Sequence, residues 1–111
     1  FHVKLYEKSP TKSAFLSNIS KKLGLKCKIV CCDVKSTKVE SNHIVCRAFR
    51  KLPYILNFSR ENCVKKHKII IMKGKKAQEE INNTSQMKNY KYRLENSITD
   101  SNSKIIILNA E

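Results

Sequence analysis

The amino-acid sequence predicts a mixed α/β fold with a mostly parallel sheet and an antiparallel pair at its C-terminal edge. Short apolar runs with strand character alternate with segments whose apolar residues recur at helical spacing. Such alternation is typical of a parallel sheet that helices cover on both faces. The last two strand-like runs are joined instead by a turn-rich segment at residues 99–103, which favours antiparallel pairing.

The first β–α unit has start and stop signals for both of its elements. Residues 1–6 place apolar side chains at alternate positions, and this run ends at an acid, Glu7. Ser9 is expected to cap a helix that has Pro10 in its first turn. Gly24 follows the last apolar residue of helical spacing, so we expect the helix to end there.

The same periodicities predict the remaining elements. Strands are expected at residues 27–32, 43–46, 68–72, 90–94 and 104–108, and helices at residues 52–58 and 75–83. Since neither a repeat nor a linker interrupts the chain, we expect residues 1–111 to form a single domain.

The net charge of +14 permits two interpretations. Basic side chains that meet phosphates release counterions, so the charge fits a nucleic-acid partner. The 23 basic residues are, however, mostly lysines scattered along the chain, and Asn and Ile are also abundant. A bias toward A and T in the coding DNA would produce the same composition, and both interpretations stay open.

Cysteine usage favours a reducing compartment. The five cysteines are an odd number and include no Cys-x-x-Cys pair, so neither a disulfide framework nor a zinc site is expected. The sequence has neither a signal-peptide pattern nor an apolar run long enough to cross a membrane. We therefore expect a cytoplasmic protein.

Candidate site residues are those that end strands, because doubly wound sheets bind ligands beyond the carboxyl ends of their strands. This criterion selects Glu7, residues 33–35, Arg47 and Lys73. An acid such as Glu7 commonly binds ribose hydroxyls about 20 residues after a glycine-rich turn, which here would lie before Phe1. The alternatives are a solvated acid for Glu7, a structural salt bridge for Arg47, and a solvated lysine or one at the start of a helix for Lys73.

Four stretches carry a resemblance to a known family: LYEKSPTKSAFL, KKLGL, VCRAFRKLPYIL and IIIMKGKKAQEEI. In this order and at these spacings they resemble the 16S ribosomal RNA guanine-N7 methyltransferases, also called glucose-inhibited division protein B. They cover most of residues 3–81. The resemblance implies a Rossmann-like class I methyltransferase sheet without its first strand and glycine loop. The chain would then be the C-terminal two-thirds or so of such an enzyme.

The resemblance also implies a cofactor, a partner and roles for individual residues. The cofactor would be S-adenosyl-L-methionine, and the partner would be 16S ribosomal RNA or the small ribosomal subunit, with no metal and no membrane. The acid that ends the first strand would bind the ribose, and the pair after the next strand would flank the adenine. The implied cofactor-binding residues are Glu7, Val34, Lys35 and Arg47, and the implied RNA-binding residues are Lys12 and Lys73.

Some positions depart from the family's pattern. An acid is usual where Lys35 stands and a basic residue where Asp33 stands, while Thr11 replaces a basic residue and His43 replaces an aspartate. These changes leave open whether the product is still active, and an inactive remnant is one alternative.

The implied chemistry suits the residues that are present. Guanine N7 carries a lone pair and no proton, so methyl transfer needs alignment and no general base. The sequence shows neither a Ser–His–Asp set nor a paired carboxylate site, and the catalytic residues are not identified. A non-enzymatic basic RNA-binding module is the other alternative, although few aromatic residues are placed for base stacking.

Overall fold

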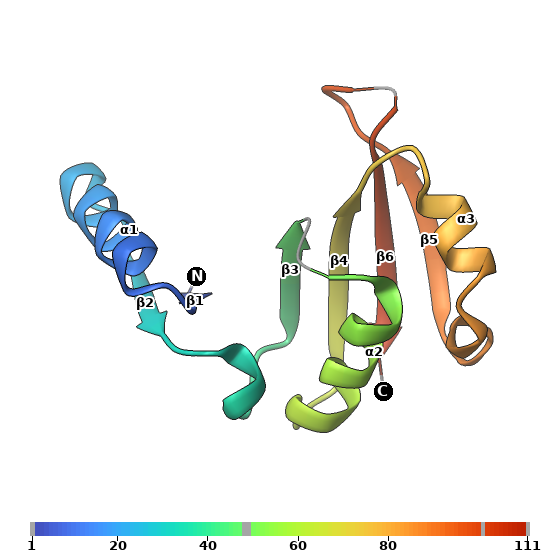
Figure 1. Cartoon of the computed structure of the whole chain (residues 1–111), viewed down its shortest axis with the longest axis horizontal. Coiled ribbons are helices and arrows are strands. Elements are labelled where there is room, and N and C mark those ends of the chain that lie inside the picture. Colours follow the sequence, from blue (N-terminus) through green and yellow to red (C-terminus); the bar gives the residue numbers. More distant parts are fainter. Residues whose placement is uncertain (1, 48–49, 101, 111) are drawn as a thin grey trace. The chain divides into compact units, whose positions relative to one another are not determined.

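The structure is a computed structural model that describes residues 2–47, 50–100 and 102–110. The chain divides into two compact units, Phe1–Lys38 and Val39–Glu111. Figure 1 labels their helices and strands, and each unit is described by itself. The expectation of a single domain stays a prediction.

The first unit contains β1 (Val3–Glu7), α1 (Pro10–Leu23), β2 (Cys27–Cys31) and the short 3-10 helix η1 (Val34–Ser36). The predicted ends of α1 are confirmed. The Ser9 hydroxyl accepts the Lys12 N–H at 3.3 Å, and Gly24 adopts the left-handed conformation with φ 63°. The N–H of Gly24 then reaches the Lys21 carbonyl, which closes the helix.

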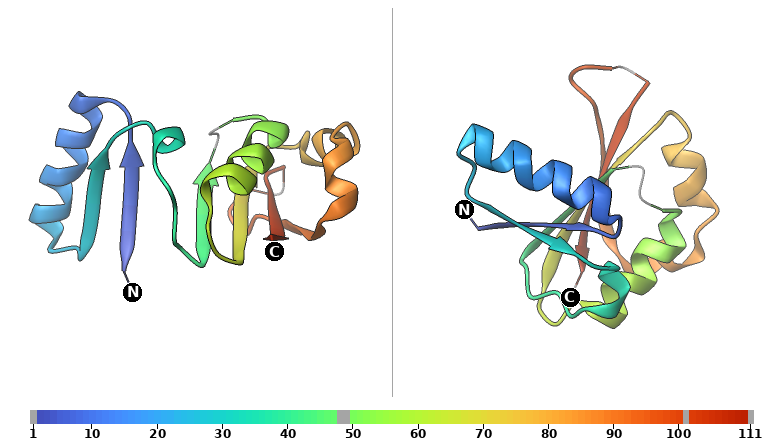
Figure 2. Two further views of the ribbon diagram at one scale, coloured as in Figure 1. Left: turned by 90° about the horizontal axis from the view of Figure 1, so that it is seen from below. Right: turned by 60° about the vertical axis from the view of Figure 1, so that its left-hand side comes forward.

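β1 and β2 are parallel neighbours, and α1 connects them (Figure 2, left). Val3 pairs with Cys27 at one end and Glu7 with Cys31 at the other. Because the register is parallel, the carboxyl ends of both strands lie at the same edge of this sheet. The loops that follow Glu7 and Cys31 are therefore neighbours.

The second unit contains β3 (His43–Arg47), α2 (Leu52–Asn62), β4 (His67–Lys73), α3 (Ala77–Asn82), the 3-10 helix η2 (Ser85–Asn89), β5 (Lys91–Asn96) and β6 (Lys104–Ala110). Its sheet has the order β3-β4-β6-β5, in which β3 and β4 are parallel and β6 is antiparallel to both of its neighbours. The predicted antiparallel pair is confirmed, with β5 at the edge and β6 inside the sheet.

The hydrophobic core lies in the second unit, where α2 and α3 pack against the sheet. Its fully buried large side chains are Leu52, Leu56, Ile69, Ile71, Ile106 and Leu108. In the described part of the first unit the buried residues are two serines, Ser13 and Ser20, while Phe15 and Leu23 are exposed. The first unit thus lacks an apolar core of comparable size, so its free energy of unfolding is expected to be small.

Each sheet has two unpaired edges within the described residues, at β1 and β2 in the first unit and at β3 and β5 in the second. β1 pairs with β2 alone and β3 pairs with β4 alone. Exposed apolar side chains lie on these strands, among them Val3, Leu5 and Val45. Such edges can accept a further strand, which fits the expectation of a class I methyltransferase sheet that lacks one strand.

Candidate functional site

Glu7 ends β1 with a half-buried side chain that its own loop holds in place. Its Oε1 accepts the backbone N–H of Ser9 at 3.2 Å, and its carbonyl accepts the Ser13 hydroxyl at 3.1 Å. A carboxylate offers about four lone-pair directions, and this contact uses one of them. The carboxylate is therefore oriented at the strand end and keeps the capacity to accept hydrogen bonds from a ligand.

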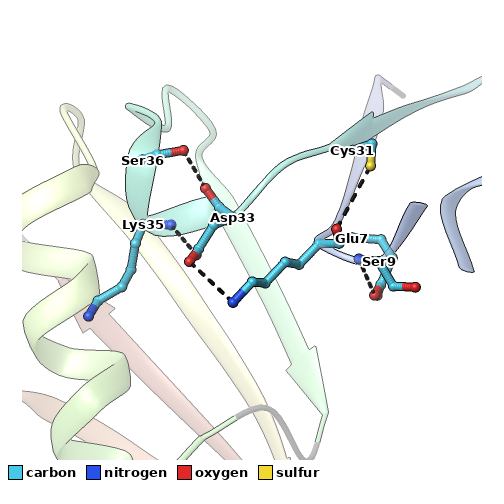
Figure 3. Close-up of polar contacts among 7 residues, drawn as sticks. Glu7, Ser9, Cys31, Asp33, Lys35 and Ser36 are labelled. Carbon is cyan, nitrogen blue, oxygen red and sulfur yellow. Dashed lines mark hydrogen bonds and ion pairs between the residues drawn. The ribbon is translucent and has the colours of Figure 1, made fainter. Parts of the chain in front are cut away.

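The loop after β2 lies beside this acid, as Figure 3 shows. Asp33 caps η1, since its Oδ1 accepts the Lys35 N–H at 3.1 Å and its carbonyl accepts the Ser36 hydroxyl at 2.7 Å. The Lys8 Nζ lies 4.0 Å from Asp33 Oδ2, and the Cys31 thiol donates to the Lys8 carbonyl at 3.9 Å. Asp33 thus has a structural role, although it departs from the family's pattern.

The pair Val34 and Lys35 begins η1, so both expected adenine neighbours follow the carboxyl end of β2. Val34 is half-buried and Lys35 is exposed. The Lys35 side chain extends away from Glu7 (Figure 3). The structure therefore brings three of the four expected cofactor-binding residues to one strand edge within the first unit.

Arg47 lies at the corresponding edge of the second unit. It pairs in parallel register with Met72, so the carboxyl ends of β3 and β4 meet. A hollow of about 560 Å³ opens here, and its walls include Arg47, Lys73 and the turn between β5 and β6. Among the described residues Arg47 forms no ion pair, so the structure gives no support to a structural salt bridge. That Glu7 and Arg47 bind the same cofactor, as the resemblance implies, stays a prediction.

Lys73 is engaged within the protein. Its side chain is only 14% exposed, and its Nζ donates to the Arg50 carbonyl at 2.8 Å and to Glu80 Oε1 at 3.1 Å. Glu80 Oε1 also accepts the Leu52 N–H at 2.6 Å. The alternative of a solvated lysine is therefore wrong. Glu80 was missed as a site residue, although acids after a Lys-Gly strand end were part of the resemblance.

Lys12 lies in the first turn of α1, where it is exposed. Its backbone N–H is bound by the Ser9 hydroxyl, and the side chain extends from the helix start that follows Glu7. The position is accessible to an RNA phosphate, and that role stays a prediction.

A larger hollow of about 760 Å³ lies at the opposite end of the second sheet, near the start of β4. Its walls include Arg60, Lys65, Lys66 and Lys91. We place the candidate site at the smaller hollow, because ligands of doubly wound sheets bind at the carboxyl ends of the strands. Size alone does not identify a site.

The titratable groups near the second sheet are poor nucleophiles and bases. Burial raises the pKa of the Cys46 thiol, and the Lys73 ammonium opposes part of this rise. Burial also raises the pKa of Cys63. His67 donates from Nδ1 to the Lys65 carbonyl at 2.7 Å, and its Nε2 lies 2.5 Å from the Ser59 hydroxyl. Neither thiol is an activated thiolate near neutral pH, and both imidazole nitrogens are engaged.

Within the described ranges, no group of three His, Cys, Asp or Glu side chains is arranged to hold a metal ion. None of the helices among those residues combines the length and the apolar character that a membrane crossing requires.

Similarity to solved structures identifies the fold. A methyltransferase from Geobacter sulfurreducens matches with a TM-score of 0.66 at 7% identity, over 98% of this chain and 58% of that one. TehB from Haemophilus influenzae matches with a TM-score of 0.63 at 10% identity, over 100% and 50%. TYW2 of M. jannaschii, solved in complex with AdoMet, matches with a TM-score of 0.61 at 15% identity, over 97% of this chain and 56% of that one. The class I methyltransferase fold is thus confirmed.

Sequence comparison identifies the family. Curated small-subunit ribosomal RNA methyltransferases G of Pelagibacter ubique and Orientia tsutsugamushi (strain Ikeda) are 30% and 32% identical over 105 residues. The matches cover 94% and 95% of this chain, but 49% and 52% of the relatives. The chain spans about half the length of these relatives, which is less than the expected two-thirds. The family model of rRNA small subunit methyltransferase G matches residues 1–106, so the chain belongs to this family.

Proposed function

We propose that the chain is part of an enzyme that transfers a methyl group from S-adenosyl-L-methionine to guanine N7 of 16S ribosomal RNA. Family membership supports this proposal, and one structural observation carries it. The parallel register of Glu7 with Cys31 sets an oriented carboxylate beside the turn that holds Val34 and Lys35. An acid at the end of one strand suits the ribose of a nucleoside, and an apolar side chain after the neighbouring strand suits its base.

The residues at this edge fit the proposed cofactor chemically. The Glu7 carboxylate can accept hydrogen bonds from two ribose hydroxyls, since only one of its lone-pair directions is occupied by Ser9. The half-buried Val34 offers an apolar contact for a base. In the second unit, the exposed Arg47 lines the 560 Å³ hollow, where its guanidinium can meet a carboxylate or phosphate. When bound, the cofactor supplies a methyl group on a positively charged sulfur.

The reaction needs alignment more than acid–base chemistry. Guanine N7 attacks through a lone pair, so no proton has to leave it. Holding the two reactants in line can lower the activation free energy by about 7 kcal/mol or more. This agrees with the raised thiol pKa values of Cys46 and Cys63 and with the engaged ring nitrogens of His67. The protein's contribution would be to hold the two reactants and exclude water.

The substrate is proposed to be the small ribosomal subunit or its 16S RNA, in the cytoplasm. A net charge of +14 favours contact with phosphates. Lys12 is the proposed RNA-facing lysine of the first unit, because it is exposed beside the edge that carries Glu7. Lys73 is a different case, since its ammonium is bound by Arg50 and Glu80.

Calorimetric titration with S-adenosylhomocysteine tests the proposal on two proteins, this chain and a version extended upstream to the relatives' full length. We expect the extended protein to bind S-adenosylhomocysteine. Its variant Glu7→Ala should bind about tenfold more weakly, because one or two charge-assisted hydrogen bonds are lost. Glu40→Ala, which removes an exposed acid from the second unit, is the control and should bind normally. Binding by neither protein would count against the cofactor, and salt-dependent RNA binding without it would favour a non-enzymatic module.

A further inference from the structure

A clamp of two oppositely charged side chains ties the end of β4 to the start of α2. The clamp consists of Lys73 and Glu80, whose Nζ and Oε1 lie 3.1 Å apart. Lys73 also donates to the Arg50 carbonyl at 2.8 Å, and Glu80 accepts the Leu52 N–H at 2.6 Å. The end of β4, helix α3 and the start of α2 thus meet at one pair of side chains, and the start of α2 is more than 20 residues away from both in sequence.

The pair is largely shielded from solvent, and each of its two charged groups has two partners in the protein. The Lys73 and Glu80 side chains are 14% and 26% exposed. Charges in such surroundings are stabilising only if their partners satisfy them, and removal of one partner leaves the other charge uncompensated. Here the ammonium has two acceptors and the carboxylate has two donors. The arrangement resists displacement better than an exposed ion pair does.

The clamp supplies a helix cap that the local sequence lacks. Lys51 stands at the N-cap of α2 and makes no side-chain capping bond. The first N–H groups of a helix have no partner inside it and carry partial positive charge, so a carboxylate there is favourable. Glu80 fulfils this function for Leu52 from α3. The position of the α2 start therefore depends on the clamp.

The clamp lies next to two backbone segments of the second unit, the end of β3 and the start of α2. On one side, Arg47 is held by β-pairing with Met72, the residue before Lys73. On the other side, the Arg50 carbonyl and the Leu52 N–H are held by Lys73 and Glu80. Both Arg47 and Lys73 line the 560 Å³ hollow. The clamp thus joins the start of α2 to the end of β4, the strand that pairs with Arg47 at the rim of that hollow.

We infer that Lys73 is a positioning residue that acts, together with Glu80, by holding the start of α2 against the end of β4, the strand that pairs with Arg47, and that it does not contact RNA. This inference rests on the proposed function, because it assigns Arg47 to ligand binding. It differs from the role that the resemblance implied for Lys73. A lysine that faced RNA would present its ammonium to solvent, whereas this one is bound by two groups of its own chain.

The test compares Lys73→Met, Lys73→Arg and Glu80→Gln in the intact protein, with Lys75→Met as the matched control. Lys75 is an exposed lysine two positions further along. The first measurement is hydrogen exchange at the Leu52 amide. We expect exchange to be about tenfold faster in Lys73→Met, intermediate in Glu80→Gln and near wild type in Lys73→Arg and Lys75→Met. Unchanged exchange in both Lys73→Met and Glu80→Gln would overturn the clamp, whether or not the protein binds a cofactor.

Two binding measurements separate positioning from RNA contact. Lys73→Met should weaken S-adenosylhomocysteine binding about fivefold, and by less than about twofold when Arg47→Ala is already present, because coupled residues are not additive. The slope of the logarithm of the RNA association constant against the logarithm of the salt concentration should be the same in Lys73→Met and wild type. A slope lower by about 1 would identify a lost phosphate contact and overturn the inference. A wild-type protein that does not bind S-adenosylhomocysteine refutes the proposed function, while the exchange measurement still decides the clamp.

Discussion

Glu80 caps a helix to which it does not belong, since its Oε1 accepts the N–H of Leu52 at 2.6 Å across 28 residues of sequence. Because Lys73 binds the same oxygen, one carboxylate both caps the start of α2 and neutralises a partly buried cation. Loss of this carboxylate has two costs, an uncapped helix and an uncompensated ammonium. Both belong to the second unit, where the core lies.

The variant Glu80→Ala should therefore lower the free energy of unfolding by about 2 kcal/mol, of which the lost cap accounts for about 1. Urea unfolding followed by circular dichroism measures this change. Glu79→Ala, the exposed neighbour in the same helical turn, should stay within about 0.5 kcal/mol of wild type. Equal effects of the two variants would contradict the dual role of Glu80.

Ser9→Ala removes the cap of α1, and about 1 kcal/mol of helix stability should be lost. The loss should be local, so exchange at the Lys12 amide should become faster while the second unit stays unaffected. Asn18→Ala on the exposed face of the same helix serves as control and should be neutral or slightly stabilising, because alanine has the higher helix propensity. A general loss of protection across the chain would be the contrary result.

Ile71→Ala should lower the free energy of unfolding by about 3 kcal/mol, because Ile71 is 1% exposed and its truncation leaves a cavity in the core. Val45→Ala, on a strand edge and 59% exposed, should cost less than about 1 kcal/mol. Equilibrium urea midpoints of the two variants at equal protein concentration test the contrast. Similar midpoints would contradict the placement of Ile71 inside the core and of Val45 outside it.

Because of Cys46, the free energy of unfolding should depend on pH in the alkaline range. Its pKa is raised above the ordinary value of 9.0 by burial, so the unfolded thiol ionises at a lower pH than the folded one. Between these two pKa values the folded state binds more protons, so the stability falls as the pH rises above about 9. Unfolding curves from pH 7 to 10 should show this fall, and it should be smaller in Cys46→Ala. An identical pH profile in the variant would contradict the shift.

Self-association should occur through the unpaired strand edges. Val45 is an exposed apolar residue on β3, and a lysine on such an edge prevents strand pairing between molecules. Val45→Lys should therefore reduce the sedimentation coefficient measured at high concentration. Ile98→Lys removes an exposed isoleucine in the turn after β5 and should not have this effect. A similar reduction by both variants would indicate general hydrophobic association.

Local signals predicted the elements well. The cap at Ser9, the stop at Gly24 and the strand around Ile69–Ile71 depend on neighbouring residues, and each lies where the sequence indicates. The helix expected at residues 52–58 continues to Asn62, because its last turn is polar and the prediction followed apolar side chains. The 3-10 helices η1 and η2 were missed, since such short segments have no measurable period.

Non-local relationships could not be predicted in the same way. Their positions at strand ends selected Glu7 and Arg47, and the resemblance gave them roles. No local pattern shows that Glu80 would cap Leu52, because the two residues approach only after α2, β4 and α3 have packed. Lys73 was recognised by its position at a strand end. Its burial against Arg50 and Glu80 is a property of the folded chain, and this changes its expected role.

The position of β6 between β4 and β5 has a consequence for synthesis. β5 precedes β6 in the chain, yet within the described residues its backbone pairs with β6 alone. During translation β5 therefore leaves the ribosome before a strand exists for it to join. The sheet of the second unit can close only once Lys104–Ala110 has emerged, so a nascent chain that stalls before this segment should be readily degraded by proteases.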